Sequence, residues 1–180
     1  MRSLPPIPGW NIYGKSMLSI KVFLDTNVLI DVLSSVKRPS ADYSGRIFQE
    51  LRNNRIEGVI TIQSIVDASY VFRRDNASLD LFLDRILQIR NYVNLEPLDY
   101  SDLQDALLSD PSDFEDELQC YHADGAGCDF FITSDRKLRN RHTKTGMRFC
   151  TPEEFVHILD VLPLQQRPAN TLTSERRREP

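Results

Sequence analysis

Short apolar runs typical of buried strands alternate with amphipathic segments along most of this chain. We expect strands, in order along the sequence, at Ile20–Leu24, Glu57–Ile62, Tyr92–Leu95, Phe130–Thr133 and Met147–Cys150. Strands that alternate with helices usually pair in parallel, because a crossover helix carries the chain back across the sheet. The alternation therefore predicts an α/β fold, with a central, mostly parallel sheet flanked by helices in a three-layer sandwich.

The intervening segments carry the apolar spacing and the end signals of helices. Helices are expected over Asn27–Leu33, Tyr43–Asn53, Ser64–Arg73, Ala77–Arg90 and Asp113–Ala123. The clearest of them shows an amphipathic stripe at Leu79, Phe82, Leu83, Ile86 and Leu87. Three capping boxes mark helix starts: Ser101 with Gln104, Ser112 with Glu115, and Thr151 with Glu154, where Pro152 takes the first helical position.

Length and composition favour one globular domain. The chain has 180 residues, of which 41% are hydrophobic and 27% charged, which is enough for a full core and unlike a disordered chain. We expect the domain at 18–162, between a loosely held leader (1–17) and a polar tail (163–180). No apolar run approaches a membrane span, and no secretory signal is visible. Three scattered cysteines suit a reducing compartment, so we expect a cytoplasmic protein.

Four aspartates stand at expected strand ends or within the first turns of helices: Asp25, Asp67, Asp116 and Asp135. In an α/β sheet, side chains at the carboxyl ends of the strands face the crevice where ligands bind. Carboxylates gathered there repel one another, so they either take up protons or hold a cation. Each also has a structural explanation: a helix cap for Asp25, a solvated helix position for Asp67, a dipole partner for Asp116 and a turn for Asp135.

As a set, the four aspartates favour a hard divalent cation. Mg²⁺, or Mn²⁺ in its place, prefers oxygen ligands; Mg²⁺ takes one or two carboxylates directly and keeps several waters. We expect Asp25 and Asp116 to contact the metal, and Asp135 and Asp67 to hold its waters or a second ion. A metal-bound water has a lowered pKa and can attack a phosphodiester while the metal stabilises the developing charge.

A basic segment follows the last of these aspartates. It contains six lysines and arginines and no acid: Arg136, Lys137, Arg139, Arg141, Lys144 and Arg148. The whole chain, in contrast, has a net charge of −4. A basic flank beside an acidic cluster is expected where a polyanion crosses a metal site. Arg136, Lys137 and Arg139 are therefore candidates for contacts with such a polyanion, and a solvated loop is the alternative.

In their order along the chain, these residues resemble the PIN-domain family of metal-dependent nucleases, which includes the toxins of bacterial VapBC-type toxin–antitoxin pairs. The resemblance spans about residues 20–158, with motifs in Leu24–Asp31, Asp113–Ala123 and Ile132–Asp135. It implies a PIN-like sandwich and a metal-dependent endoribonuclease. It also implies metal-site acids at Asp25, Asp116 and Asp135, with polar support from Thr26, Asn27 and Thr133. An antitoxin partner and a homodimer are further expectations from the family.

One position departs from the family pattern. The second family acid is usually Glu, whereas Asp67 occupies the matching position here and is one methylene shorter. A PIN-like module that binds RNA or a protein without cutting therefore stays open as the alternative. Other classes fit less well. A dehalogenase-like phosphatase needs an acid where Asn27 stands, a response-regulator receiver needs an acidic pair after the first strand, and the cysteines and histidines lack zinc-site spacing.

Overall fold

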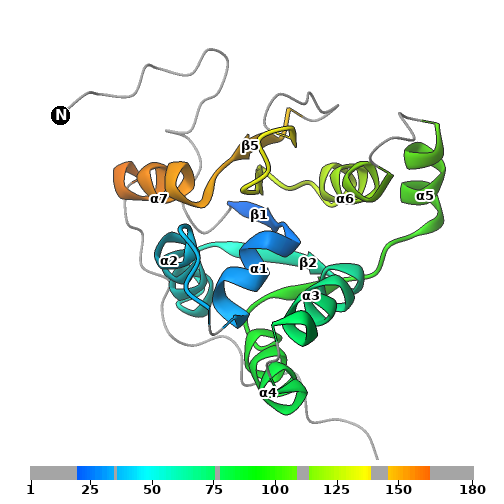
Figure 1. Cartoon of the computed structure of the whole chain (residues 1–180). Coiled ribbons are helices and arrows are strands. Elements are labelled where there is room, and N and C mark those ends of the chain that lie inside the picture. Colours follow the sequence, from blue (N-terminus) through cyan, green and yellow to red (C-terminus); the bar gives the residue numbers. More distant parts are fainter. Residues whose placement is uncertain (1–19, 35, 76–77, 109–113, 139–145, 163–180) are drawn as a thin grey trace, which may run out of the picture.

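The strands form one parallel sheet, as the alternating pattern predicts. The structure is a computed structural model that describes residues 20–34, 36–75, 78–108, 114–138 and 146–162. Within them the strands are β1 (Lys21–Leu24), β2 (Glu57–Thr61), β3 (Asn94–Glu96), β4 (Phe130–Ile132) and β5 (Arg148–Cys150). Their spatial order is β3-β2-β1-β4-β5, and all neighbours pair in parallel. The first strand therefore lies in the middle of the sheet (Figure 1).

Helices connect and cover the strands. They are α1 (Thr26–Leu33), α2 (Ala41–Arg52), α3 (Ile62–Arg74), α4 (Leu79–Ile89), α5 (Tyr100–Leu107), α6 (Phe114–Gly125) and α7 (Pro152–Val161). The elements whose ranges were expected from sequence begin and end within about two residues of those ranges. The predicted α/β sandwich is thus confirmed, and the capping box of α7, with Thr151, Pro152 and Glu154, is present as expected.

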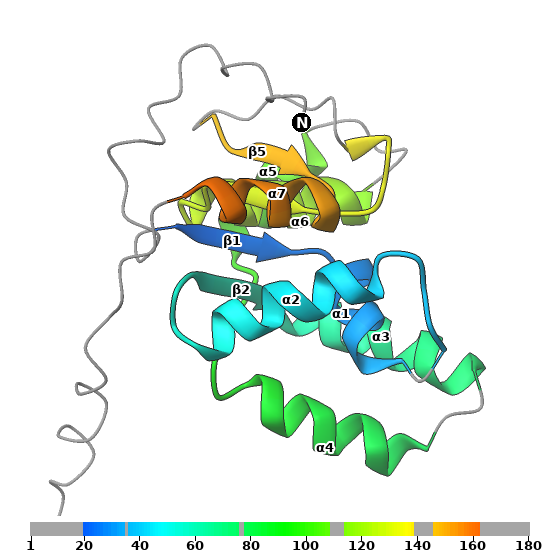
Figure 2. The same ribbon diagram turned by 90° about the vertical axis from the view of Figure 1, so that its left-hand side faces the viewer.

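Both faces of the sheet are buried, because successive side chains of a strand point to opposite faces. Val22 and Leu24 of β1 belong to the larger core, which α1, α2, α3, α4 and α7 complete. Phe23 points to the other face, where its ring stacks on Phe131 at 4.8 Å between centroids and α6 supplies Cys120. Figure 2 shows β1 and β5 pointing the same way, with α1 and α3 near the carboxyl end of β1.

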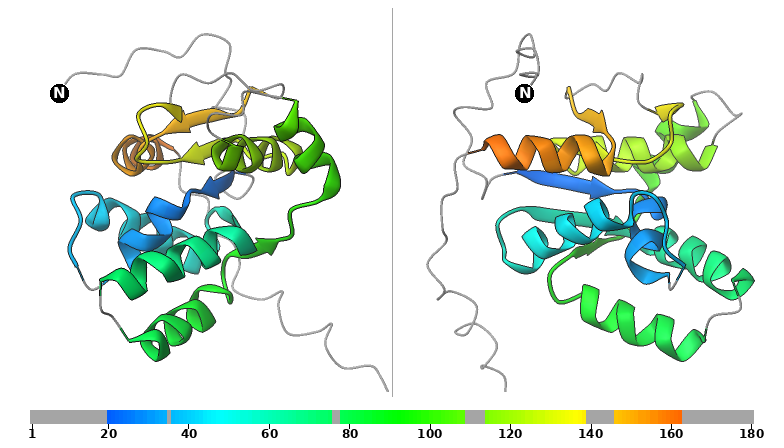
Figure 3. Two further views of the ribbon diagram at one scale, coloured as in Figure 1. Left: turned by 45° about the vertical axis from the view of Figure 1, so that its right-hand side comes forward. Right: turned by 60° about the vertical axis from the view of Figure 1, so that its left-hand side comes forward.

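The amphipathic stripe of α4 is only partly buried. Phe82 is 2% exposed and packs against Phe72 of α3 at 5.3 Å between ring centroids. Leu79, Leu83 and Leu87 are 41%, 50% and 52% exposed. Figure 3 shows α4 at the margin of the molecule beside α3, so its neighbouring helices cover only one edge of the stripe.

The capping box expected at Ser101 was placed two residues too late. Asp99 is the N-cap of α5 and accepts hydrogen bonds from the backbone N–H groups of Ser101 and Asp102. Asp102 closes the box by accepting from the backbone N–H of Asp99 at 3.0 Å. An aspartate suits both positions as well as the expected pair does.

Several sequence expectations lie outside the described residues. They are the leader (1–17), the tail (163–180), Ser112 as the cap of α6, and Arg139. In the part of the chain that is described, no helix is long and apolar enough to cross a membrane. Cys120, Cys128 and Cys150 are buried free thiols. Their cytosolic setting stays a prediction.

Candidate metal centre

Asp25 is the central residue of the candidate site and lies directly after β1, at the N-cap position of α1. Its side chain makes no capping hydrogen bond. Oδ2 instead accepts from Thr133 Oγ1 at 2.6 Å and from Asn27 Nδ2 at 3.3 Å. Asp25 is only 7% exposed, and this burial raises its pKa, while the two hydrogen bonds act in the opposite direction. The carboxyl group is therefore oriented by its neighbours and sensitive to any nearby charge.

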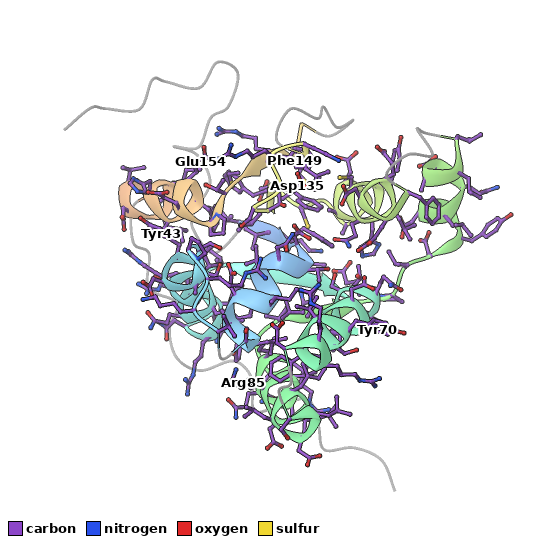
Figure 4. The ribbon with its side chains drawn as sticks, viewed as in Figure 1. Tyr43, Tyr70, Arg85, Asp135, Phe149 and Glu154 are labelled. Atoms are coloured by element: carbon purple, nitrogen blue, oxygen red, sulfur yellow. The ribbon has the colours of Figure 1, made fainter. Side chains whose placement is uncertain are left out.

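Thr133 connects this carboxyl group to the turn after β4. Its hydroxyl donates to Asp25 and accepts from the backbone N–H of Asp135 at 2.9 Å. Asp135 Oδ1 accepts from the backbone N–H of Lys137 at 2.7 Å, so this carboxylate stabilises the turn. Asp135, labelled in Figure 4, thus has the turn role considered from sequence, and hydrogen bonds connect it to Asp25 through Thr133.

Asp67 and Glu115 form a carboxyl pair between α3 and α6. Asp67 Oδ1 accepts from Gln63 Nε2 at 2.8 Å, whereas no donor among the described residues reaches its buried Oδ2. The carboxyl group of Glu115 is within hydrogen-bonding reach of Asp67. Burial and this neighbouring carboxylate raise the pKa of Glu115 from 4.5 to about 7. Two carboxylates in contact need a proton or a cation between them.

Asp116 and Asp25 complete the acidic group. Their charges also raise the pKa of Glu115, although less than Asp67 does. Both act on Cys120 too, one turn after Asp116 on α6, where burial is the first reason that its thiol pKa rises to about 12. The side chains of Asp25, Asp67 and Asp116 therefore all lie within electrostatic reach of Glu115.

These four acids suit a hydrated divalent ion better than a fully liganded one. No three His, Cys, Asp or Glu side chains in the described part of the chain are arranged as a ready metal cage. Mg²⁺, however, binds through one or two carboxylates and keeps most of its waters. The donorless oxygen of Asp67 and the raised pKa of Glu115 are the features that a cation would relieve. The residues present therefore fit a hard divalent metal.

A comparison of the sequence with family models identifies the family. A family model of the PIN domain matches residues 21–137. The chain belongs to the PIN-domain family. A comparison with curated proteins finds no match. The match of the family model thus confirms the resemblance that the order of the acidic motifs indicates.

Two solved structures share the fold of this PIN domain at low sequence identity. One is the Mycobacterium tuberculosis toxin VapC20, described as cleaving the sarcin–ricin loop. It has a TM-score of 0.53 and 9% identity, and the match covers 66% of this chain and 95% of that one. The other is PAE2754 from Pyrobaculum aerophilum, with a TM-score of 0.52 and 16% identity, over 83% of this chain and 96% of that one. At these identities the likeness concerns the fold alone.

Glu115 is the site residue of the PIN domain that sequence reasoning missed. The spacing of Ser112 and Glu115 was interpreted as a capping box, but the Glu115 side chain contacts Asp67 across the fold. Its position beside Asp116 in the first turn of α6 was the available signal. Asp67 and Glu115 are far apart in sequence, and no local pattern predicts that they meet.

The polar and basic candidates of the PIN domain are placed unequally. Asn27 contacts Asp25, whereas the hydroxyl of Thr26 is buried and has no hydrogen-bond partner among the described residues. Arg136 and Lys137 are exposed in the turn that follows β4. They are therefore accessible to a substrate on the side of the centre where Asp135 lies.

Proposed function

We propose that this protein is a divalent-metal-dependent endoribonuclease and the toxin of a toxin–antitoxin pair. The contact between the carboxyl groups of Asp67 and Glu115, beside Asp25 and Asp116, carries the proposal. Like charges at the carboxyl end of a parallel sheet are unfavourable unless a cation neutralises them. PIN-domain membership and the VapC20 fold support RNA as the substrate class.

Asp25, Glu115 and Asp116 are our candidates for direct contact with Mg²⁺ or Mn²⁺. Asp67 and Asp135 would act through waters. A bound ion supplies a water of lowered pKa and neutralises charge that develops on the phosphate. The hydroxyl of Thr133 and the amide of Asn27 orient Asp25 and favour its ionised form. Arg136 and Lys137 would contact the RNA backbone, together with Arg139 of the same basic segment.

Replacing Asp25 tests this function. Asp25→Asn keeps the shape of the side chain but removes its charge. We expect cleavage of a labelled RNA in Mg²⁺ or Mn²⁺ to fall by about 100-fold or more. Asp160→Asn is the matched control, because Asp160 pairs with Arg46 on the α2–α7 side and lies outside the acidic group. An Asp25→Asn variant that cleaves as fast as the parent would refute the assignment.

A non-cleaving binding module is the second candidate. Aspartate in place of glutamate at position 67 favours it. Thermal unfolding during a Mg²⁺ titration separates the two candidates. A metal site raises the melting temperature as the metal concentration increases, and the increase is lost in Asp25→Asn. No change at millimolar Mg²⁺ would favour the binding module.

An exposed apolar surface supports a protein partner. It consists of two helical stripes: Ile62, Val66 and Tyr70 on α3, and Leu79, Leu83 and Leu87 on α4. Tyr70 projects from α3 at the edge of the molecule (Figure 4). Large exposed apolar patches commonly mark interaction sites. We expect growth arrest when the protein is expressed alone and rescue by the product of a neighbouring antitoxin gene. Sedimentation of the purified protein tests the expected homodimer.

A further inference from the structure

We propose that Arg38 binds a phosphate group of the RNA beside the metal centre, an inference that rests on the proposed nuclease function. Arg38 lies in the connection between α1 and α2, which runs at the end of the molecule toward which β1 points (Figure 2). Its Nη2 donates to Asn27 Oδ1 at 3.4 Å, and Asn27 Nδ2 donates to Asp25 at 3.3 Å. A guanidinium group is therefore two hydrogen bonds away from the central carboxylate.

A buried carboxylate, that of Asp31, holds the guanidinium of Arg38 in place. Its Nε lies 3.0 Å from Asp31 Oδ1, and the side chain of Asp31 is fully buried. The second oxygen of Asp31 accepts from Ser44 Oγ at 2.7 Å. Asp31 is thus fixed by two elements and in turn fixes Arg38. An arginine that is already oriented loses less conformational entropy when it binds an anion.

Arg38 keeps donors for a ligand. A guanidinium has five N–H groups, and the ion pair with Asp31 and the hydrogen bond to Asn27 engage Nε and Nη2. The side chain is 31% exposed, so its outer edge reaches solvent. Two N–H groups of a guanidinium match two phosphate oxygens in a bidentate pair. The geometry therefore leaves a fork of donors next to Asn27.

The negative charge of the centre would repel RNA unless cationic groups nearby offset it. Asp25, Asp67, Glu115 and Asp116 repel a polyanion that approaches the sheet end. Arg136 and Lys137 offset this repulsion after β4. Arg38 offers a positive charge from the α1–α2 side, so the RNA backbone would pass between two cationic flanks with the acids in between.

The competing explanation is that Arg38 only neutralises the buried Asp31. A double variant separates the two roles. Arg38→Gln alone leaves the Asp31 carboxylate buried and without its ion pair, so it destabilises the fold under either explanation. Arg38→Gln combined with Asp31→Asn removes both charges and should recover much of the lost stability. Arg46→Gln is the matched control, since Arg46 forms an exposed ion pair with Asp160 on α7.

The test measures the affinity of the full chain for a short fluorescein-labelled oligoribonucleotide in EDTA, by anisotropy at several salt concentrations. We expect the double variant to bind about tenfold more weakly than the parent. The slope of log K against log salt should fall by about 0.7, the value for one phosphate contact on a single strand. Arg46→Gln should match the parent in both, and Arg38→Lys should fall between them because it keeps the charge without the fork.

Each result decides the proposal. If the folded double variant binds with the affinity and salt slope of the parent, Arg38 has no phosphate contact and the proposal is overturned. If the parent binds RNA but does not cleave it in Mg²⁺, the nuclease function fails while the affinity comparison still decides the role of Arg38. If the parent does not bind the RNA in EDTA, the role of Arg38 is overturned, and the cleavage assay in Mg²⁺ decides the nuclease function separately.

Discussion

Thr133 offers a sharp test of the centre, because one hydroxyl group joins two segments there. Thr133→Val keeps the size and branching of a side chain that is fully buried, so packing should change little. It removes the donor to Asp25 at 2.6 Å and the acceptor for the Asp135 N–H at 2.9 Å. We expect the variant to be less stable than the parent at neutral pH.

The magnitude follows from these two hydrogen bonds. A hydrogen bond to a charged group contributes roughly 1.5–3 kcal/mol and one between neutral groups about 0.5–1.5 kcal/mol. The summed loss is about 2–4.5 kcal/mol. For a domain of this size each kcal/mol lowers the melting temperature by about 2–4 °C, which gives a decrease of roughly 4–18 °C.

The loss should depend on pH with a defined sign. The pKa of Asp25 is already raised in the folded state, so folding is most favourable when this group is protonated and less favourable as pH rises through its folded pKa. The Thr133 hydroxyl opposes that rise. Its removal should therefore cost most at neutral pH and less as acid protonates Asp25.

Thermal and urea unfolding of the parent, Thr133→Val and Thr133→Ser measure this effect. Thr133→Ser retains the hydroxyl and loses only a methyl group, so it should lie much nearer the parent than the valine variant does. Equal melting temperatures for Thr133→Val and the parent at neutral pH would show that the hydroxyl does not support Asp25, and the account of the centre given above would then be wrong.

Three further substitutions have defined outcomes. Without metal and above pH 7, Glu115→Gln should have a higher melting temperature than the parent. The difference should vanish toward pH 4.5, because the parent takes up a proton between these pH values and this uptake stabilises its fold. Gly58→Ala places a Cβ 2.6 Å from Leu51 Cδ2 and should lower stability by about 1–3 kcal/mol, measured by the urea midpoint. His122→Phe removes the 2.7 Å partner of the buried Asp102 carboxylate and should cost about 1–3 kcal/mol in the same assay, with partial recovery in His122→Asn.

Sequence patterns predicted the features that depend on near neighbours. Thr151, Pro152 and Glu154 stand within four positions of one another, so the start of α7 follows from local hydrogen bonds alone. The strand at β1 was predictable because Val22, Phe23 and Leu24 are apolar on both faces. The parallel sheet then follows from the alternation of strands and helices.

Features that depend on distant segments were harder to predict. The contact between Glu115 and Asp67 requires α6 and α3 to meet across the end of the sheet, which no spacing within either helix indicates. The exposure of Leu83 on α4 likewise depends on which neighbours cover that helix. The position of β1 between β2 and β4 could not be derived, because alternation predicts parallel pairing but not strand order.

The hydrogen bond between Asp25 and Thr133 spans 108 positions of the chain. On the ribosome, which makes the amino end first, β1 emerges long before β4. Until β4 has been synthesised and has paired with β1, Asp25 lacks the hydroxyl that orients it, and an unfinished chain carries aspartates without an assembled centre. If the protein cleaves RNA, its activity can begin only when translation of the domain is nearly complete.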